Sequence, residues 1–460
     1  MNKRTTALSL ILSGLLAFGS AFAAQDGGAG IRLPQGRLTL AEAVDLALTN
    51  NPMVEATTAG VDAAVAGVSV AKAGRLPMLK FNEKYTNSNN PVYVFGTLLE
   101  QGRFGVNNFD VNFLNDPGSI SNFRSGVNLQ IPLFNRFRVS AGIEQARIRE
   151  NQSQSDADWV KQQLRLHVIQ AYFGLLVAQQ RQTVAAEAVH TAEVEVENIR
   201  AKVDQGLAVR SDLLSMQVQL AEFRQQQVQA AGDEQTALAS LNTVLSVPIG
   251  TVVQLSGNLE DREFPPPDQA QLIESALARR PDYLQSIQQV RLAEQQVRMA
   301  KGDFWPDLNL FAQVGHSSRD LTDGSGDFAV GASLNFDIVD FGRSARVAQA
   351  AAETRGARAE QTRTANQIRL EVVRAMQGYL TSRQRLQLAS AAVDQATEAQ
   401  RIVQDRLDVG LTTVTEVLRA QTALLRARLN QLGARYEHYL GYAQVLLASG
   451  SLDDVSPFSK

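Results

Sequence analysis

The sequence predicts a mainly α-helical protein with a small β part, in which one arrangement of helices and strands occurs twice. The first observation is internal repetition: Pro77 recurs as Pro306, 229 positions later, and Gly206 recurs as Gly410, 204 positions later. The second is a set of long proline-free tracts with helical periodicity. The third is a pair of aromatic-rich windows in which apolar and polar residues alternate, as they do along a half-buried strand.

The first residues have the three parts of a secretory signal peptide. Lys3 and Arg4 precede an apolar run at 7–18, and residues 21–23 have the small-x-small pattern that signal peptidase recognises. We therefore expect residues 1–23 to be removed on export. The chain contains no cysteine, so we expect neither a lipid anchor on an N-terminal cysteine nor any disulfide.

The mature chain is expected to consist of two repeats and a short tail. The first repeat covers residues 24–264, the second covers 265–455, and the tail covers 456–460. Three successive prolines at 265–267 open the second repeat and favour an extended linker.

Each repeat begins with a short amphipathic helix followed by a longer one. Thr39 and Glu42 form a capping box at the start of the first copy, and Asp268 is the expected cap in the second. The longer helices are expected over residues 52–73 and 281–302.

Two strands are expected in each repeat after the proline that ends the second helix, Pro77 or Pro306. Proline disfavours helical backbone in the residue before it, and the period of the apolar residues then changes from about 3.6 to about 2. One face of these strands is apolar and the other is small or polar. The residues of the apolar face are Leu79, Phe81 and Tyr85; Val127, Leu129, Ile131 and Leu133; Leu308, Leu310, Ala312 and Val314; and Phe328, Val330, Ala332, Leu334, Phe336 and Ile338.

Long helical hairpins follow the strands. Helical tracts over 136–204 and 342–408 are broken at Gly206 and Gly410, and helices then resume as far as residues 245 and 448. About seventy residues at 1.5 Å each span about 100 Å. The last helix carries a heptad seam, which is typical of coiled-coil packing. The seam consists of Leu418, Leu425, Leu432, Tyr439 and Leu446, with Leu429, Tyr436 and Ala443 four residues after three of them.

The small number of strands limits how such a sheet could sit in a membrane. Membrane barrels start at about eight strands, and an open sheet edge in lipid leaves backbone groups unpaired. Closure would need further copies of the chain: two would supply eight strands and three would supply twelve. The alternative is a β-sandwich with an apolar inner face, against which the export signal and the few strands both argue.

Composition argues against several classes of function. The formal charge of −3 gives a nucleic-acid partner no electrostatic support. No nucleophile–base set, phosphate loop or metal-ligand cluster is present in the sequence, so we expect neither an enzyme nor a bound cofactor. The four histidines lack zinc-type spacing, and the acidic residues of 320–327 are expected to form a polar hairpin turn rather than a calcium loop.

Several short motifs, each occurring twice in the same order, resemble the TolC-type outer-membrane efflux proteins over nearly the whole mature chain. They are the helix-to-strand segments GRLPML (74–79) and DFWPDL (303–308), the strand-to-helix turns IPLFNRFR (131–138) and FDIVDFGR (336–343), and the hairpin turns QGLAVRSDLL (205–214) and VGLTTVTEVL (409–418). The FNRFR segment departs from the glycine-containing turn that is usual in the family at this bend.

The resemblance implies a homotrimer in the outer membrane of a Gram-negative bacterium, with four strands per protomer in a shared twelve-stranded β-barrel and a long periplasmic α-barrel. It also implies a passive conduit with porin activity, for substrates that an inner-membrane pump of the RND or ABC type delivers through a periplasmic adaptor (membrane fusion) protein. Tripartite efflux and type I secretion both use this arrangement. The alternative is a soluble periplasmic coiled-coil adaptor or scaffold, which would have one helical hairpin in a β-rich body rather than two hairpins.

The resemblance assigns the hairpin turns to contact with the adaptor. The competing interpretation is that the same residues only cap the helices, since reversing two long helices needs a positive-φ residue such as glycine, and both interpretations can hold. The assigned residues are Gly206, Leu207, Ser211, Gly410, Leu411, Thr412 and Thr415.

Asp212, Glu416 and Arg419 are candidates for the periplasmic aperture, because the family keeps acidic residues near these positions. Arg419 stands where the resemblance would place an acid. Acids in a first helical turn also complement the helix dipole, worth about 0.3–1 kcal/mol, so the two interpretations stay open. No residue is expected to bind a metal.

The first copy carries an insertion between its two strands. Pro77 and Gly126 are 49 positions apart, whereas their counterparts Pro306 and Gly331 are 25 apart, which leaves 24 additional residues (49 − 25). The segment at 90–118 is expected to be a long extracellular loop and strand extension, and the sequence assigns it no role.

Overall fold

The computed structural model describes residues 36–265 and 268–459. The expected signal peptide at 1–23 and the last two prolines of the linker lie outside these ranges. By their contacts, residues 37–460 form one unit.

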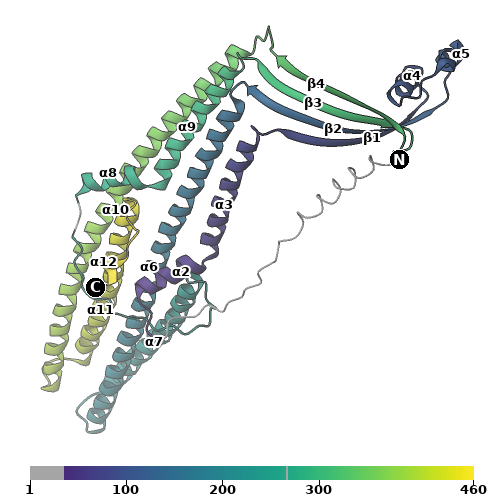
Figure 1. The fold of residues 1–460 in the computed structure, drawn as a ribbon. Helices are drawn as coiled ribbons and strands as arrows, with labels where there is room; N and C mark the ends of the chain where they lie inside the picture. The colour runs from purple at the N-terminus through teal and green to yellow at the C-terminus, as the bar shows by residue number, and fades with distance from the viewer. Residues whose placement is uncertain (1–35, 266–267, 460) are drawn as a thin grey trace. The chain divides into compact units, whose positions relative to one another are not determined.

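The same order of helices and strands occurs twice along the chain (Figure 1). The first copy consists of α2 (Leu40–Asn50), α3 (Pro52–Ala73), β1 (Met78–Ser88), β2 (Ile120–Asn135), α6 (Arg138–Asp204) and α7 (Arg210–Val244). The second copy consists of α8 (Gln269–Arg279), α9 (Pro281–Gly302), β3 (Asp307–Ser318), β4 (Gly324–Asn335), α10 (Arg343–Asp408) and α11 (Val414–Ala448), and a short helix α12 (Ser456–Ser459) follows.

The predicted helix caps are present at the start of both copies. The Thr39 hydroxyl accepts a hydrogen bond from the Glu42 backbone N–H at 3.2 Å, and the Glu42 carboxylate accepts one from the Thr39 N–H at 2.9 Å. This reciprocal pair is a capping box. In the second copy an Asp268 carboxylate oxygen accepts a hydrogen bond from the Gln271 N–H at 3.3 Å. The predicted ranges of the longer helices, 52–73 and 281–302, are confirmed.

The four strands form one antiparallel sheet in the order β1-β2-β3-β4. The apolar residues pair with one another across the strands: Phe81 lies opposite Val127, Val127 lies opposite Val314, and Val314 lies opposite Phe328. The register shifts once, between Pro132 and Phe134, where β2 pairs with β3. Strands β1 and β4 each pair on one side only, so the sheet has two open edges.

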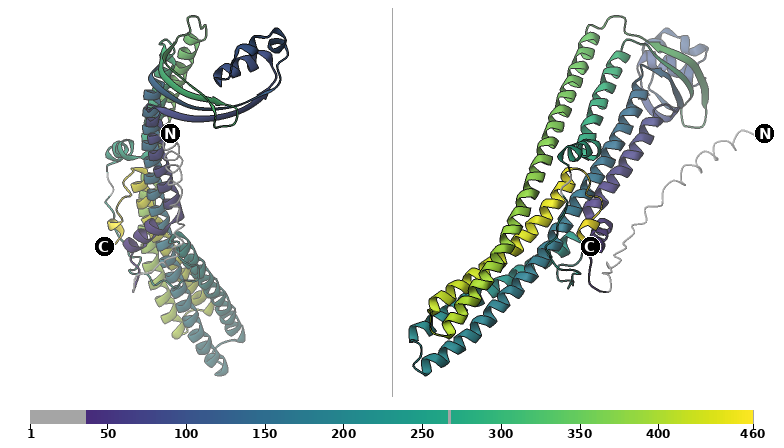
Figure 2. Two further views of the ribbon diagram at one scale, coloured as in Figure 1. Left: turned by 45° about the vertical axis from the view of Figure 1, so that its right-hand side comes forward. Right: turned by 90° about the vertical axis from the view of Figure 1, so that its left-hand side faces the viewer.

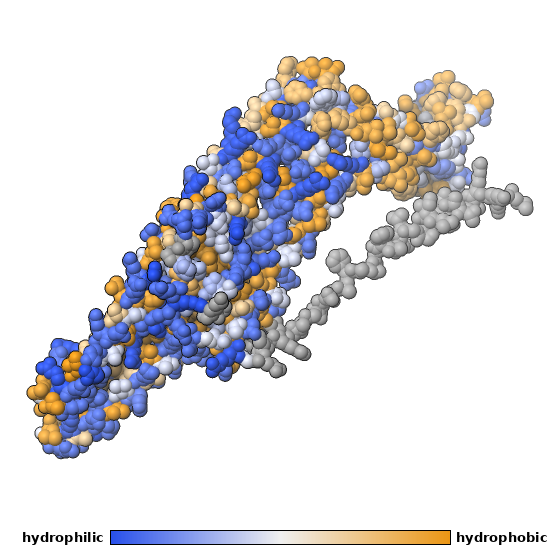
Figure 3. Space-filling model, turned by 60° about the vertical axis from the view of Figure 1, so that its left-hand side comes forward, coloured by the Kyte–Doolittle hydropathy of each residue, from blue (hydrophilic) through white to orange (hydrophobic). Residues whose placement is uncertain are grey.

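The apolar face of the sheet is exposed. Phe81 is 68% exposed, Phe328 is 80% exposed and Val330 is 76% exposed. Figure 3 shows hydrophobic residues gathered over the sheet, whereas the helical part is mostly hydrophilic. A strand face with this much apolar surface requires a non-aqueous neighbour.

The long helices pack lengthwise in pairs (Figure 2). Helix α6 packs on α7 and α10 on α11, and α6 also contacts α11, which joins the two hairpins. At 67 residues, α6 is about 100 Å long. One helix, α3, is long and apolar enough to cross a membrane by length and composition, but it packs along α6 and is mostly small residues.

An aromatic core lies where the end of the first copy crosses the last helix. The ring of Phe264 stacks on Tyr442 with centroids 4.4 Å apart. The Tyr379 hydroxyl donates to the Phe264 carbonyl, and the Tyr172 hydroxyl donates to the Leu38 carbonyl at 3.0 Å. Burial raises the pKa of Tyr172 to about 12, so this hydroxyl stays a donor at neutral pH. The helices are therefore held together by satisfied polar groups as well as by apolar packing.

The structure corrects two expectations. Strand β4 ends at Asn335, so Phe336 and Ile338 belong to the segment before α10 rather than to the strand. The inserted segment is not a loop with a strand extension, because it forms helix α4 (Pro91–Glu100), the 3₁₀ helix η1 (Val106–Phe109) and helix α5 (Val111–Asn115).

Candidate functional site

Each long hairpin reverses at a glycine in left-handed backbone. Gly206 and Gly410 both have a φ of +75°. In each tip, the N–H of the residue after the glycine donates at 2.8 Å to the carbonyl five positions earlier, as in a Schellman motif. The capping role of both glycines is therefore confirmed. Nothing lies within 4 Å of a Cβ added at either position, so a side chain there would be strained by φ and not by crowding.

The tips present apolar side chains to solvent. Leu207 is 74% exposed and Leu411 is 69% exposed. Ser211 and Thr415 occupy the equivalent exposed position in the first turn of α7 and α11, and Thr412 is half-buried. These small polar residues leave the leucines accessible, which suits contact with another protein.

The candidate aperture residues lie in the first two turns of the helices that follow the tips. Asp212 and Glu416 are both first-turn acids, as the helix-dipole interpretation requires. Arg419 forms an ion pair with Glu416 at 2.8 Å, and both side chains are exposed. Asp212 has no ion pair within the described ranges, 36–265 and 268–459. The two tips therefore share their backbone geometry but differ in how their acidic residues are paired.

The two hairpins are bound together just above the tips. A buried cluster joins α6, α7 and α11, and the Lys202 ammonium lies 3.7 Å from the Asp408 carboxylate between the two hairpins. Burial, and then the nearby Asp408 charge, raise the pKa of Glu195. The members of the cluster are Val189, Ala192, Val196, Ile199, Met216, Leu220, Phe223, Val414, Val417 and Leu425.

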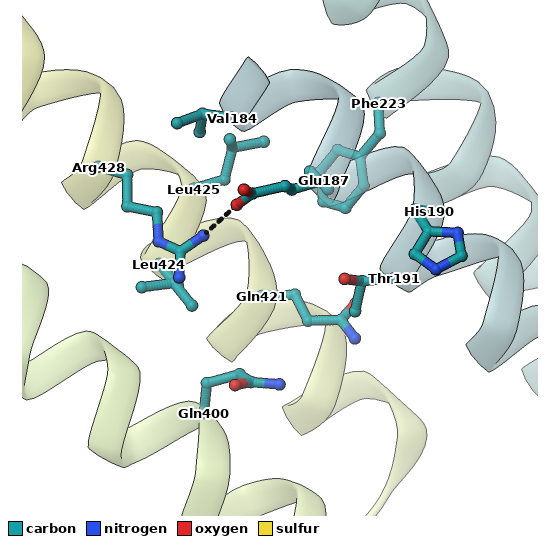
Figure 4. Close-up of a pocket in the computed structure, with 11 residues that line it drawn as sticks. Val184, Glu187, His190, Thr191, Phe223, Gln400, Gln421, Leu424, Leu425 and Arg428 are labelled. Carbon is teal, nitrogen blue, oxygen red and sulfur yellow. Dashed lines mark hydrogen bonds and ion pairs between the residues drawn. The ribbon is translucent and has the colours of Figure 1, made fainter. Parts of the chain in front are cut away.

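A cavity of about 300 Å³ opens beside this cluster (Figure 4). The Glu187 carboxylate and the Arg428 guanidinium bridge α6 and α11 across it at 3.1 Å. The amide of Gln421 is buried and has no hydrogen-bond partner among the residues described. The cavity lies in the wall between the hairpins, so it belongs to the packing of the tips.

The predicted helix–strand boundaries are present, and each strand begins directly after its proline. Strand β1 begins at Met78, one residue after Pro77, and strand β3 begins at Asp307, one residue after Pro306. The helices end four residues before the prolines, at Ala73 and Gly302, as the steric demand of proline requires.

An ion-pair network around the buried Arg136 joins sheet and helices, and the sequence did not predict it. The guanidinium of Arg136 is buried and lies 2.9 Å from the Asp307 carboxylate and 3.2 Å from that of Asp337. Arg346 joins Asp303 at 2.9 Å on the second copy. These ion pairs join residues that are far apart in the sequence, so no local sequence pattern reveals them.

The turn between β2 and α6 adopts left-handed backbone without a glycine. Arg136 and Phe137 both adopt positive φ, 54° and 63°. The buried ion pairs of Arg136 hold the first residue, and the ring of Phe137 lies edge-on to Phe134 with centroids 5.1 Å apart. Tertiary contacts thus impose a backbone conformation that glycine would adopt without strain.

Polar and titratable residues elsewhere are accounted for by structure. Residues 319–323 form the predicted polar turn, in which an Asp320 oxygen accepts hydrogen bonds from Thr322 and Asp323, whereas Asp327 lies in β4. His438 is buried in the aromatic core, its Nε2 lies 2.9 Å from the Arg262 carbonyl, and burial lowers its pKa. Within the described ranges no group of three or more His, Cys, Asp or Glu is placed to hold a metal ion.

Comparisons with known proteins agree on one family. The family model described as "Outer membrane efflux protein" matches residues 43–247 and 272–451. The alkaline protease secretion protein AprF of Pseudomonas aeruginosa is 23% identical over 441 residues, covering 91% of this chain and 85% of that protein. The outer membrane efflux protein BepC of Brucella suis is 22% identical, covering 98% of this chain and 91% of its own length. The Campylobacter jejuni CmeC outer membrane channel has the same fold, with a TM-score of 0.76 at 20% identity over 91% of this chain and 86% of that one.

Proposed function

Because this chain belongs to the outer membrane efflux protein family, we propose that it acts as a homotrimer in which three four-stranded sheets close into one twelve-stranded barrel. The chain is an outer-membrane channel subunit of a tripartite export system and is not an enzyme. The trimer, the adaptor contact and the aperture are the parts we propose.

The observation that carries the proposal is an open sheet with an exposed apolar face. One chain leaves the edges of β1 and β4 unpaired, and unpaired backbone groups in lipid cost several kcal/mol each. Pairing β4 of one copy with β1 of the next removes every edge at once. The exposed face that includes Phe81, Val314 and Phe328 would then contact lipid, and the polar face would line the lumen.

The exposed apolar surface of α3 supports assembly of the helical part. Met53, Val65 and Val70 are exposed, whereas Val68 alone in this helix is buried within the chain. Burial of such a face against a neighbouring copy would remove it from water. The division of the chain into repeats at 24–264 and 265–455 fits this assembly, since each repeat supplies one helical hairpin and two strands to its protomer.

We also infer that the tips contact a periplasmic adaptor (membrane fusion) protein. Their exposed leucines, Leu207 and Leu411, are accessible apolar groups directly after the capping glycines, and Val209 and Val409 are exposed beside them. The names of these relatives record protease secretion for AprF and efflux for BepC, so both secretion and efflux occur among them. Either an ABC-type or an RND-type inner-membrane pump would serve as the source of energy.

Asp212, Glu416 and Arg419 are proposed to surround the aperture at the tips. Threefold repetition would bring three copies of Asp212 near one axis, where their like charges repel and would attract cations. The Glu416–Arg419 pair is neutral as a unit, whereas the Asp212 carboxylate has no ion pair in the described part of the chain.

The test has three parts. Membrane fractions of the expressing cell should release the protein with detergent and not with mild buffer, cross-linking should give a trimer, and the purified trimer should conduct ions in planar bilayers. Release by mild buffer as a monomer would instead support the adaptor or scaffold alternative and would overturn the proposal.

The tip contact is tested by Leu207→Ser together with Leu411→Ser. Trimer yield should stay normal, while export and co-purification of the adaptor are lost. The matched control is Leu388→Ser, an exposed leucine on the same helical part but away from the tips. Normal export by the tip double variant would refute the adaptor contact.

A further inference from the structure

The inserted segment of the first copy is a small folded unit that lies on the sheet. Val94, Leu98 and Ile120 are buried together, with Tyr93, Phe104 and Phe113 packed against them. The ring of Phe104 lies edge-on to Phe95 at 4.8 Å and to Phe109 at 5.0 Å between centroids. The segment therefore has a core of its own, which a mobile surface loop would lack.

Polar anchors fasten this unit to one face of the sheet. The Gln101 side chain is 3% exposed, and its amide donates to the Asn122 side-chain oxygen at 2.9 Å and to the Ser121 carbonyl at 2.8 Å. The Glu100 carboxylate lies 3.1 Å from the Arg124 guanidinium, which in turn lies 3.2 Å from the Asp327 carboxylate.

The anchored face is the polar one. Phe123 and Val127 belong to the apolar face, and side chains alternate along a strand, so Asn122 and Arg124 point to the opposite face. Helix α4 contacts β2, β3 and β4. Figure 2 shows the insert on the concave side of the curved sheet, near the β3–β4 turn. The interior of a closed barrel is on this side.

From this placement, and resting on the trimer proposed above, we propose that the insert is a constriction inside the outer mouth of the barrel. Three inserts would lie around the axis, and they would meet through apolar side chains that stay mostly exposed within one chain. These are Val92, Val106, Phe109 and Val111, of which Val106 is 87% exposed. The constriction limits the size of what leaves, and a large cargo must displace it by breaking the Glu100–Arg124 and Gln101–Asn122 contacts.

The lack of cysteine permits a direct test with thiol reagents. Gln313→Cys places a single thiol on the polar face of β3, deeper in the barrel than the insert. The trimer in vesicles is labelled from the outer side with a small maleimide and with a bulky polyethylene-glycol maleimide. We expect the small reagent to react at the same rate with and without residues 91–118, and the bulky reagent to react roughly tenfold faster when they are replaced by a short turn.

Controls separate the outcomes. Arg319→Cys lies in the exposed β3–β4 turn and should be labelled equally by both reagents in every background. Should the deletion fail to assemble, Glu100→Ala with Gln101→Ala keeps the whole chain and should also speed the bulky reagent. An unchanged rate for the bulky reagent in an assembled trimer would overturn the constriction alone, whereas failure of the wild-type chain to form a trimer would overturn the proposed function.

Contact between inserts has its own readout. Val106→Cys, as the single cysteine, should form cross-linked dimers within the trimer on mild oxidation. Lys80→Cys on the edge strand, exposed on the polar face but away from the insert, should not. Absence of cross-linking at position 106 would show that the inserts do not meet.

Discussion

Replacing Gly302 with alanine should destabilise the junction between sheet and helices, because there is no space for a methyl group. A Cβ at this position would lie 2.0 Å from the Arg136 carbonyl oxygen, where ordinary contacts begin at 3.4 Å. The backbone at Arg136 must therefore move by more than an ångström. That residue also holds a buried ion pair to Asp307 and a second ion pair to Asp337, whose side chain is 61% exposed.

The expected cost follows from two terms. Overpacking alone costs about 1–3 kcal/mol, and breaking a buried ion pair costs about 3–5 kcal/mol. The better helix propensity of alanine returns at most about 1 kcal/mol. We therefore expect a loss of about 2 kcal/mol in the free energy of unfolding if the turn shifts as a unit, and about 4 kcal/mol if the Arg136 pairs break.

Urea unfolding of the detergent-solubilised protein measures this loss by far-UV circular dichroism and by tryptophan fluorescence, since Trp305 lies three residues from the substitution. Gly232→Ala is the matched control, because that glycine is exposed within α7 and nothing lies within 4 Å of an added Cβ. The control should gain about 0.5–1 kcal/mol. Equal stability of Gly302→Ala and the control would show that the reasoning about the junction is wrong.

Two further predictions concern the hairpins and the sheet. Glu195→Gln should stabilise the protein at pH 7–8 by less than about 1 kcal/mol, because the carboxyl pKa is raised by burial and by Asp408 and the ionised form is disfavoured in the folded chain. The stability of the wild type falls as pH rises through that raised pKa. The advantage of the variant should therefore vanish below about pH 4, where the carboxyl is protonated in both the folded and the unfolded state. Urea titrations measure the free energy of unfolding of both proteins, and a difference between them that stays constant across pH would contradict this prediction. Phe328→Lys should block membrane assembly, since a lysine facing lipid near the bilayer centre costs about 2–4 kcal/mol in each protomer. Gln313→Lys on the lumen face should assemble normally. The trimer yield on non-denaturing gels measures both variants, and equal yields would mean that the two faces of the sheet are assigned wrongly.

Local chemistry explains which features the sequence could predict. The capping box at Thr39, the prolines at 77 and 306 and the glycines at 206 and 410 each act within a few residues of themselves, so their positions were visible in the chain. The end of β4 was not, because Phe336 and Ile338 continue the alternation after the backbone has left the sheet. Periodicity records which residues are apolar and does not record where hydrogen bonding stops.

Contacts between distant segments explain what the sequence could not predict. The positive φ of Arg136 depends on Asp307 and Asp337, which lie about two hundred residues away in the second copy. The folding of the insert depends on the same kind of contact, since Glu100 meets Arg124 and Gln101 meets Asn122 on the sheet. The sequence predicted a loop at 90–118, because the contacts that anchor the insert form only once the strands are paired.

Duplication gives the chain two tips with one backbone geometry but different pairing of their acidic residues, and this difference predicts how a partner distinguishes them. Asp212 carries a charge with no ion pair in the described part of the chain, whereas Glu416 is offset by Arg419 at 2.8 Å. A partner that binds by charge would therefore meet three tips of one kind and three of another in a trimer. Asp212→Asn should weaken cross-linked recovery of the adaptor more than Glu416→Gln does, and the difference should shrink at high salt because exposed charges are screened. Equal losses from both variants at low salt would mean that the adaptor recognises backbone shape and leucines alone.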